Sequence, residues 1–175
     1  MRAIFLFYIL LTGFMMTQTQ AETISQLILE TSAGQVKIDL LPEIAPNHVA
    51  RISELVESGF YDGIIFHRVI PGFMAQTGDP DGNGTGGSGQ KLAAEFSDYP
   101  YREGTVGMAR TTNPDSADSQ FFICFEGCGH LTGQYTVWGQ VAEGMDVVYN
   151  IASGQPPTEP DEIISAKLLT SGGKE

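Results

Sequence analysis

The feature that most constrains the fold is a succession of short strand-like segments joined by turns instead of by helices. Apolar Val36, Ile38 and Leu40 alternate with polar neighbours, the period-two pattern of a half-buried strand. Seven further segments read the same way, giving eight in all: 26–31, 36–40, 64–70, 73–77, 104–109, 120–125, 136–141 and 163–169. With 21 glycines to supply turns, this order favours antiparallel pairing, and barrel closure would remove exposed sheet edges. We therefore predict a mainly-β fold, an eight-stranded closed antiparallel barrel.

Two segments have helical periodicity. Residues 46–58 carry Val49, Ile52 and Val56 at helical spacing, with Pro46 suited to the first turn and Gly59 just past the end. Residues 145–152 place four apolar residues on one face, namely Met145, Val148, Ile151 and Ala152. We predict two helices that cap the ends of the barrel.

The first 21 residues have the three parts of a signal peptide. Arg2 supplies a positive charge, residues 3–16 are apolar, and Thr19-Gln20-Ala21 places small residues where a signal peptidase reads, so cleavage is expected before Glu22. The alternative is an uncleaved membrane anchor, but the apolar run is shorter than the roughly 20 residues that span a bilayer. Residues 22–175 then form a single exported domain with no stable membrane insertion.

Charge and motif spacing exclude several function classes. The chain has 9 basic and 21 acidic residues, a net charge of −12, which disfavours nucleic acid as a partner. The segment Gly82–Gly87 matches G-x-G-x-x-G, but it leads into more loop instead of opening a helix, so nucleotide binding is not expected. His48, His67 and His130 are too dispersed for a metal cluster. We expect neither metal nor cofactor, and we place His48 on the surface of the first helix.

Cys124 and Cys128 leave two possibilities open. If the chain between them were extended, their Cα atoms would be about 13 Å apart, beyond the reach of a disulfide. A tight turn at Gly127 would bring them together, and export would provide an oxidising environment.

Two runs carry the chemistry. The run 66–79 places a cation, two large apolar groups and an amide within nine residues, with Arg68, Phe73, Met74 and Gln76 in that order. In the run 119–124, strand alternation puts Gln120, Phe122 and Cys124 on one face and Phe121, Ile123 and Phe125 on the other.

These runs closely resemble the cyclophilin family of peptidyl-prolyl isomerases, as do residues 104–109 and 137–141. The resemblance spans about residues 26–169 and implies an eight-stranded barrel with two capping helices. It implies a catalytic role for Arg68 and a substrate-holding amide at Gln76. The walls of the proline pocket would be Phe73, Met74, Phe122 and Leu131. Ala109 and Arg110 would pair their backbone with the peptide, and Gln120 would line a neighbouring subsite. His67 precedes the arginine as in the family, and we expect it to support the site as a structural hydrogen-bonding residue, the alternative being an acid or base.

Three substrate-contacting positions depart from the family pattern. Arg110 stands where many members have Asn, His130 where the best-known members have Trp, and Tyr135 where many have His. None of the three removes a group that isomerisation requires.

The resemblance predicts isomerisation of X–Pro bonds without covalent chemistry. Arg68 would donate to the prolyl nitrogen only while the amide is twisted, because twisting localises the lone pair on that nitrogen. The partners would be proline-containing segments of folding exported proteins, and the protein would be a monomer. The loops look bacterial, so we expect the periplasm, with secretion or an ER lumen as alternatives. The competing function is a proline-segment binding module or chaperone without useful turnover.

Overall fold

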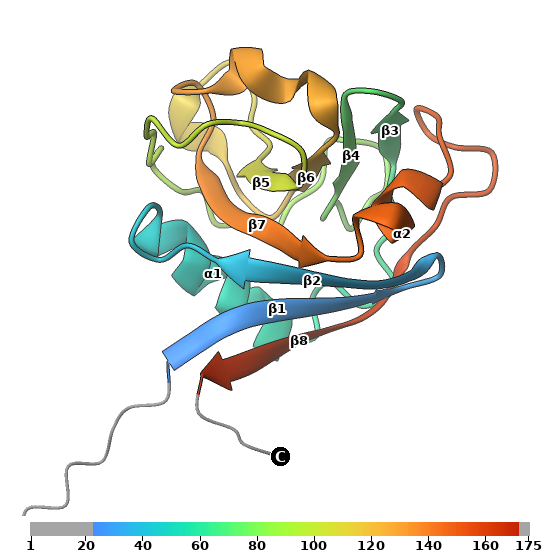
Figure 1. The fold of residues 1–175 in the computed structure, drawn as a ribbon, viewed down its shortest axis with the longest axis horizontal. Coiled ribbons are helices and arrows are strands. Elements are labelled where there is room, and N and C mark those ends of the chain that lie inside the picture. The colour runs from blue at the N-terminus through green and yellow to red at the C-terminus, as the bar shows by residue number, and fades with distance from the viewer. Residues whose placement is uncertain (1–22, 172–175) are drawn as a thin grey trace, which may run out of the picture.

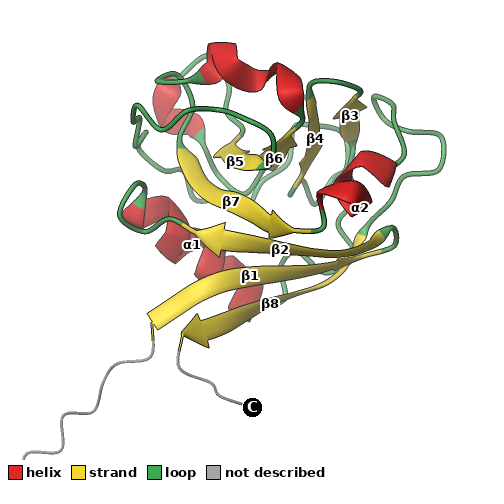
Figure 2. Cartoon of the chain, viewed as in Figure 1, coloured by secondary structure: helices red, strands yellow, loops and turns green. Residues whose placement is uncertain are grey.

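The computed structural model describes residues 23–171, so the expected signal peptide, residues 1–21, lies outside the described part. This part is built of eight strands, two α-helices and two short 3-10 helices, shown in Figures 1 and 2. In chain order they are β1 Thr23–Thr31, β2 Gly34–Leu40, α1 Pro46–Glu57, β3 Arg68–Ile70, β4 Met74–Thr77, β5 Thr105–Met108, η1 Pro114–Ser116, β6 Phe121–Cys124, η2 Glu126–Leu131, β7 Val137–Glu143, α2 Met145–Asn150 and β8 Ile163–Ser171.

All eight strands form one antiparallel sheet in the order β3-β4-β6-β5-β7-β2-β1-β8. The prediction of a closed barrel is wrong, because β3 and β8 are end strands and the sheet is an open half-barrel. The predicted strand 64–70 is a strand only in its last three residues. Before them, Ile65 makes an isolated bridge to Glu162 and Gly63 donates to the Ile163 carbonyl (N···O 2.7 Å). The two ends of the sheet therefore approach each other without forming a continuous ladder.

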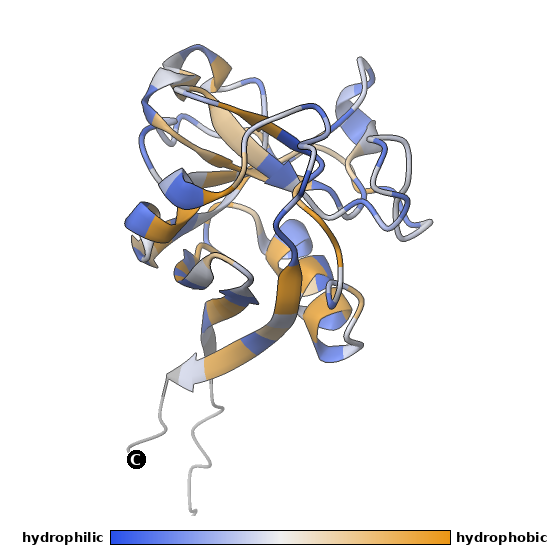
Figure 3. Ribbon diagram, turned by 90° about the vertical axis from the view of Figure 1, so that its right-hand side faces the viewer, coloured by the Kyte–Doolittle hydropathy of each residue, from blue (hydrophilic) through white to orange (hydrophobic). Residues whose placement is uncertain are grey.

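The helices cover the sheet where the sequence predicts apolar faces. Helix α1 packs against β8 and β7, and α2 packs against β2. We call the main core the buried apolar cluster that these helices form with one face of the sheet; it includes Leu27, Ile38, Ile52, Phe121, Ile123, Trp138 and Val148. The helical ribbons in Figure 3 alternate between hydrophobic and hydrophilic residues, as expected for helices with one buried face.

A smaller pocket core lies on the other face of the sheet. It consists of Met74, Tyr101, Phe122, Cys124, Cys128, Leu131 and Val137. Strand β6 contributes to both clusters, because Phe121 and Ile123 face the main core whereas Phe122 and Cys124 face the pocket core. The predicted alternation along this strand is confirmed.

Helix α1 begins at Pro46, as predicted, but the surface placement of His48 is wrong. The His48 side chain is fully buried, and its Nδ1 lies 2.5 Å from Oε2 of Glu95. The same carboxylate accepts the backbone N–H groups of Asn47 and His48, at 3.1 and 3.0 Å. Glu95 thus satisfies donors at the start of α1, where Ala45 offers no capping side chain. Because Glu95 is 47 positions from His48, no local pattern could reveal the contact.

We expect Glu95→Gln to lower the free energy of unfolding by about 1–3 kcal/mol at pH 7. Burial by itself would raise the pKa of Glu95, but the hydrogen bonds from the His48 side chain and from two backbone N–H groups outweigh it, so the pKa falls below its ordinary value of 4.5. A lowered folded-state pKa stabilises the protein above the unfolded-state value, and that stabilisation is lost as the pH falls through the folded-state pKa.

Urea unfolding at pH 7 and at successively lower pH measures this effect. The gap between wild type and variant should narrow below about pH 4.5. Glu54→Gln is the matched control, since Glu54 is exposed and forms a surface ion pair with Arg51 (3.0 Å), so its cost should stay below about 0.5 kcal/mol. Equal costs for the two variants would contradict the capping role.

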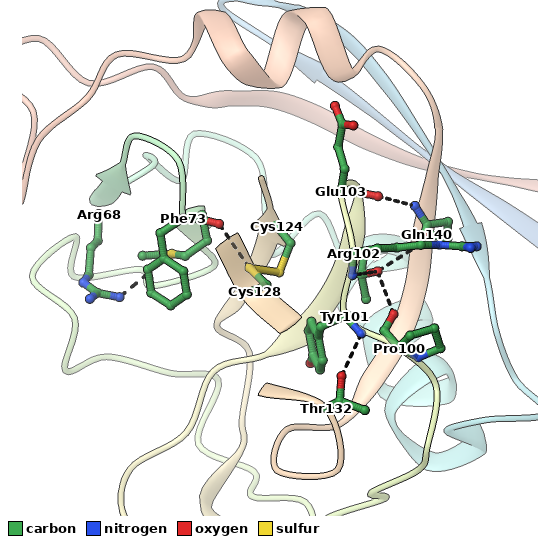
Figure 4. The surroundings of a disulfide bond; sticks show 12 residues. Arg68, Phe73, Pro100, Tyr101, Arg102, Glu103, Cys124, Cys128, Thr132 and Gln140 are labelled. Carbon is green, nitrogen blue, oxygen red and sulfur yellow. Dashed lines mark hydrogen bonds between the residues drawn. A yellow bond between two sulfur atoms is a disulfide. The ribbon is translucent and has the colours of Figure 1, made fainter. Parts of the chain in front are cut away.

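The two cysteines form a disulfide, shown in Figure 4. Helix η2 folds the chain back after β6 and brings the two Cα atoms to 6.0 Å, so the tight-turn possibility is the correct one. Gly127 donates to the Gly72 carbonyl (3.0 Å), and a Cβ at Gly127 would lie 2.5 Å from that oxygen. The disulfide and this close approach hold η2 against the residues that precede β4.

We expect loss of the disulfide to destabilise the protein by about 2 kcal/mol, because the bond closes a loop of only about five residues. For a domain of this size the melting temperature should fall by about 4–8 °C. Thermal unfolding with and without dithiothreitol measures this. The double variant Cys124→Ala, Cys128→Ala should melt at the lower temperature, with or without the reductant. An unchanged melting temperature of the wild-type protein in dithiothreitol would contradict a stabilising disulfide.

Candidate active site

The structure gathers most of the predicted site around one pocket of about 270 Å³. Its walls come from β3, β4, β6, η2 and the loop that follows β5. The lining residues are Arg68, Phe73, Met74, Gln76, Ala109, Arg110, Phe122, His130, Leu131 and Tyr135. Of the predicted site residues, only His67 and Gln120 do not line this pocket. We call it the proline pocket.

Arg68 lies at one wall and is held by neutral partners. It sits opposite Gln76 in the β3–β4 register, and its Nη1 donates to Gln76 Oε1 at 3.3 Å and lies 3.9 Å from Met74 Sδ. On the other side Nε donates to Gln155 Oε1 at 3.1 Å. No carboxylate forms an ion pair with Arg68 within the described residues. A guanidinium stays protonated in proteins, so the pocket holds an uncompensated positive charge beside Phe73 (Figure 4).

A chain of amides orients this wall. Gln76 Nε2 donates to Gln120 Oε1 at 2.9 Å, and Gln120 Nε2 donates to the Gly86 carbonyl at 2.8 Å. The line of hydrogen bonds therefore runs from Arg68 through two glutamines to Gly86 in residues 82–87, which we call the Gly-rich loop. Because each amide has both a donor and an acceptor engaged, the Arg68 side chain is held before any substrate arrives.

Aromatic contacts fix the apolar walls. The Phe122 ring stacks on Tyr101 (centroids 5.8 Å apart) and meets Tyr135 edge to face (5.9 Å). The Phe73 ring stacks on His130 at 5.6 Å, and helix η2 brings Leu131 into the same wall. The pocket thus presents rigid apolar surface next to a cation.

Arg110 and Tyr135, two of the positions that depart from the family pattern, pack on each other. The Arg110 guanidinium lies 4.3 Å from the centroid of the Tyr135 ring, a cation–π contact. Its Nη2 donates to the Gln134 carbonyl at 2.8 Å and its Nη1 to the Thr111 carbonyl at 2.9 Å. The Ala109 amide donates to the Gln120 carbonyl at 2.9 Å, so peptide pairing at Ala109 would rest on its carbonyl.

A second pocket of about 400 Å³ shares Gln76, Ala109 and Arg110 with the first. It is lined in addition by Gly84, Thr85, Gly86, Gly87, Lys91, Thr111, Ser116, Asp118 and Gln120. Gln120 therefore lines a cavity next to the proline pocket. We call this cavity the side pocket.

Asp79, which sequence reasoning missed, anchors the Gly-rich loop that borders the side pocket. Its buried carboxylate accepts the backbone N–H groups of Asp81 (2.9 Å), Asn83 (3.1 Å) and Gly84. Burial would raise the pKa of Asp79, but these three hydrogen bonds outweigh it and lower the pKa. The G-x-G-x-x-G segment is a loop that wraps a carboxylate and opens no helix.

Among the described residues, no hydrogen bond supports the predicted role of His67 as a structural hydrogen-bonding residue. The side chain is buried, and neither ring nitrogen has a hydrogen-bond partner among residues 23–171. His67 precedes Arg68, and successive side chains of an extended chain point to opposite sides, so the ring lies away from the proline pocket and near Gly84. Burial lowers its pKa, although nearby Asp79 opposes the shift.

Gln155 is a further residue that sequence reasoning missed. Its Oε1 accepts from Arg68 Nε although 87 positions separate the two residues, so no spacing rule connects them.

Within the described residues no helix is long and apolar enough to cross a membrane.

Comparison with known proteins agrees with this geometry. Residues 26–168 match the family model of the cyclophilin type peptidyl-prolyl cis-trans isomerases. A probable peptidyl-prolyl cis-trans isomerase of Brucella suis is 48% identical over 179 residues, covering 93% of this chain and 91% of the relative. The peptidyl-prolyl cis-trans isomerase of Synechococcus elongatus is 44% identical and covers 83% of this chain and 97% of its own length.

Solved structures give the same result. The cyclophilin AquaCyp293 from Hirschia baltica superposes with a TM-score of 0.75 at 33% identity, covering 82% of this chain and 73% of its own. A cyclophilin type peptidyl-prolyl cis-trans isomerase of Cryptosporidium parvum was crystallised in the presence of the dipeptide Ala-Pro. It has a TM-score of 0.78 at 29% identity, and the match covers 83% of this chain and 99% of that one. With a family model over most of the chain and relatives of such identity, the chain belongs to the cyclophilin-type peptidyl-prolyl cis-trans isomerases.

Proposed function

We propose that this protein isomerises X–Pro bonds in exported proteins by stabilising the twisted amide without covalent chemistry. The observation that carries the proposal is the placement of Arg68 beside the apolar side chains of this pocket, where no carboxylate among residues 23–171 forms an ion pair with it. The relative crystallised with Ala-Pro supports a proline-containing ligand.

The reaction requires no bond to be made or broken. The planar amide is held by resonance with a barrier of about 18–20 kcal/mol, and rotation localises the nitrogen lone pair. An N–H of Arg68 directed at that nitrogen gains strength only in the rotated state, which is the condition for lowering the barrier. An acceleration of about 10⁵ needs about 7 kcal/mol of such differential stabilisation.

The apolar walls would contribute in two ways. Phe73, Met74, Phe122 and Leu131 would enclose the pyrrolidine ring and exclude water, which strengthens the hydrogen bond from Arg68. Gln76 would hold the backbone of the substrate beside the rotating bond. Its Oε1 accepts from Arg68 (3.3 Å) and one N–H of its Nε2 donates to Gln120 (2.9 Å), which leaves the second N–H to donate to a substrate carbonyl.

A flat pH profile should accompany this mechanism. Arg68 does not titrate in the accessible pH range. Burial lowers the pKa of His67 below its ordinary value of 6.5, so its imidazole is neutral at neutral and alkaline pH. We expect kcat/KM on an X–Pro peptide, measured by a protease-coupled assay, to vary little from about pH 6 to 9. A bell-shaped profile would instead implicate a titrating acid or base.

The same assay decides between enzyme and binding module. A module that holds proline segments without turnover would bind the peptide but leave its isomerisation rate at the uncatalysed level. For the compartment we propose the periplasm, because residues 1–21 have the pattern of a signal peptide for export and the loops look bacterial. Fractionating cells that express the tagged full-length chain or a chain lacking residues 1–21 tests this; retention of both chains in the cytoplasm would contradict export.

A further inference from the structure

The residues that line the two pockets carry a net positive charge, whereas the whole chain carries a net negative charge. The chain carries 21 acidic and 9 basic residues. The residues that line the proline pocket and the side pocket include Arg68, Lys91 and Arg110 but only one acid, Asp118. The site is therefore a basic patch on an acidic protein.

The charged side chains of the side pocket are hydrogen-bonded to neutral groups or have no ion pair among the described residues. Within the described residues neither Arg110 nor Lys91 forms an ion pair, and the bonds from Arg110 go to the carbonyls of Gln134 and Thr111. The Asp118 carboxylate accepts the Ser88 hydroxyl and the N–H groups of Ser88 (2.6 Å) and Gly89 (3.1 Å). Because these donors are neutral, Asp118 keeps its negative charge. The lining of the side pocket therefore carries two positive charges and one negative charge, and an incoming carboxylate would meet a net positive charge.

Arg110 occupies the boundary between the pockets. It lines both of them, and its guanidinium is fixed over Tyr135 (4.3 Å). In an extended peptide, side chains two positions apart point to the same side, about 7 Å from each other. If a proline fills the proline pocket, the side chain two positions away can enter the side pocket, beside Arg110 and Lys91.

We propose that Arg110 and Lys91 make this enzyme selective for X–Pro segments with an acidic residue two positions from the proline. The inference rests on the proposed function, since it concerns the substrates of the same site. The selectivity is local, because the net charge of −12 repels acidic peptides at longer range.

Matched peptides test the proposal. A series would carry Glu, Gln or Lys two positions before the proline, and a second series would carry them two positions after it. Isomerisation rates come from NMR exchange spectroscopy, which needs no coupling protease. In one of the series we expect kcat/KM to be about threefold to tenfold higher for Glu than for Gln, and lowest for Lys.

Salt distinguishes the local charge from the overall charge. If Arg110 and Lys91 attract the carboxylate, raising NaCl from about 0.05 to 0.5 M should lower kcat/KM for the Glu peptide towards that of the Gln peptide. If only the net charge of the protein mattered, salt would raise the rate on the Glu peptide, and this outcome would overturn the proposal.

Variants locate the selectivity. Arg110→Gln and Lys91→Gln should each reduce the Glu-to-Gln ratio, and the double variant should bring it close to one. Arg110→Glu should reverse the order so that the Lys peptide is preferred. Arg102→Gln, an exposed arginine that lines neither pocket, is the charge-matched control and should keep the wild-type ratio.

The possible failures are distinguishable. If no peptide is isomerised, the proposed function itself is wrong. If all peptides are isomerised at equal rates, or if Arg110→Gln and Lys91→Gln leave the ratio unchanged, the isomerase stands and the selectivity is overturned.

Discussion

For an X–Pro peptide, kcat/KM of the Arg68→Ala variant should be about 10²-fold to 10³-fold lower than that of the wild type. The loss follows from removing one charged donor that acts mainly in the rotated state, the size found when a single donor to a transition state is deleted. Folding should be little affected, because the Arg68 partners Gln76, Met74 and Gln155 are neutral, so no buried charge is left unpaired.

Two further variants sharpen this test. Arg68→Lys keeps the charge but loses the fixed geometry of the guanidinium and should recover only a small part of the activity. Arg102→Ala removes an exposed arginine outside both pockets and should leave kcat/KM within about twofold. Isomerisation by Arg68→Ala at the wild-type rate would refute the mechanism, and a fall in both rate and melting temperature would point to a structural role.

Phe121 and Phe122 are neighbours on β6, but their replacement by Ala should have different effects. Phe121→Ala should mainly lower stability, and Phe122→Ala should mainly lower activity. Phe121 is fully buried in the main core, edge to face with Tyr61 and Trp138 (5.5 and 5.3 Å), and its truncation should cost about 3–5 kcal/mol of stability. Phe122 lines the proline pocket. Its truncation removes the surface that would bury the pyrrolidine ring, so kcat/KM should fall by about tenfold to a hundredfold.

The two effects are separated by measuring stability and activity on the same samples. Urea unfolding gives the first and NMR exchange at low temperature, where both variants remain folded, gives the second. Folded Phe121→Ala should keep kcat/KM within about threefold of wild type. If Phe121→Ala does not fold, Phe121→Leu should show the same pattern at a smaller cost. Equal losses of activity from both positions would contradict the division of β6 between two faces.

The elements of this fold could be predicted well because their signals are local. The alternation in 36–40, the apolar spacing with Pro46 and Gly59, and the two faces of β6 all follow from side-chain direction along a strand or helix. The errors occur where a partner is distant in sequence. His48 is buried because Glu95 reaches it from 47 positions away, and the end strands β3 and β8 leave the half-barrel open because their register is set by the whole sheet.

The sequence by itself determined which residues can take part in the chemistry: a permanent cation, apolar side chains and an amide close together in one run, and the resemblance that assigns them roles. Only the tertiary structure decided how they are held. Gln155 on Arg68 and Arg110 against Tyr135 are contacts between separate segments, whereas Asp79 holds the Gly-rich loop through residues only two to five positions away. Hydrogen bonds and charge interactions depend on distance in space, which sequence spacing fixes within one helix or strand but not between elements.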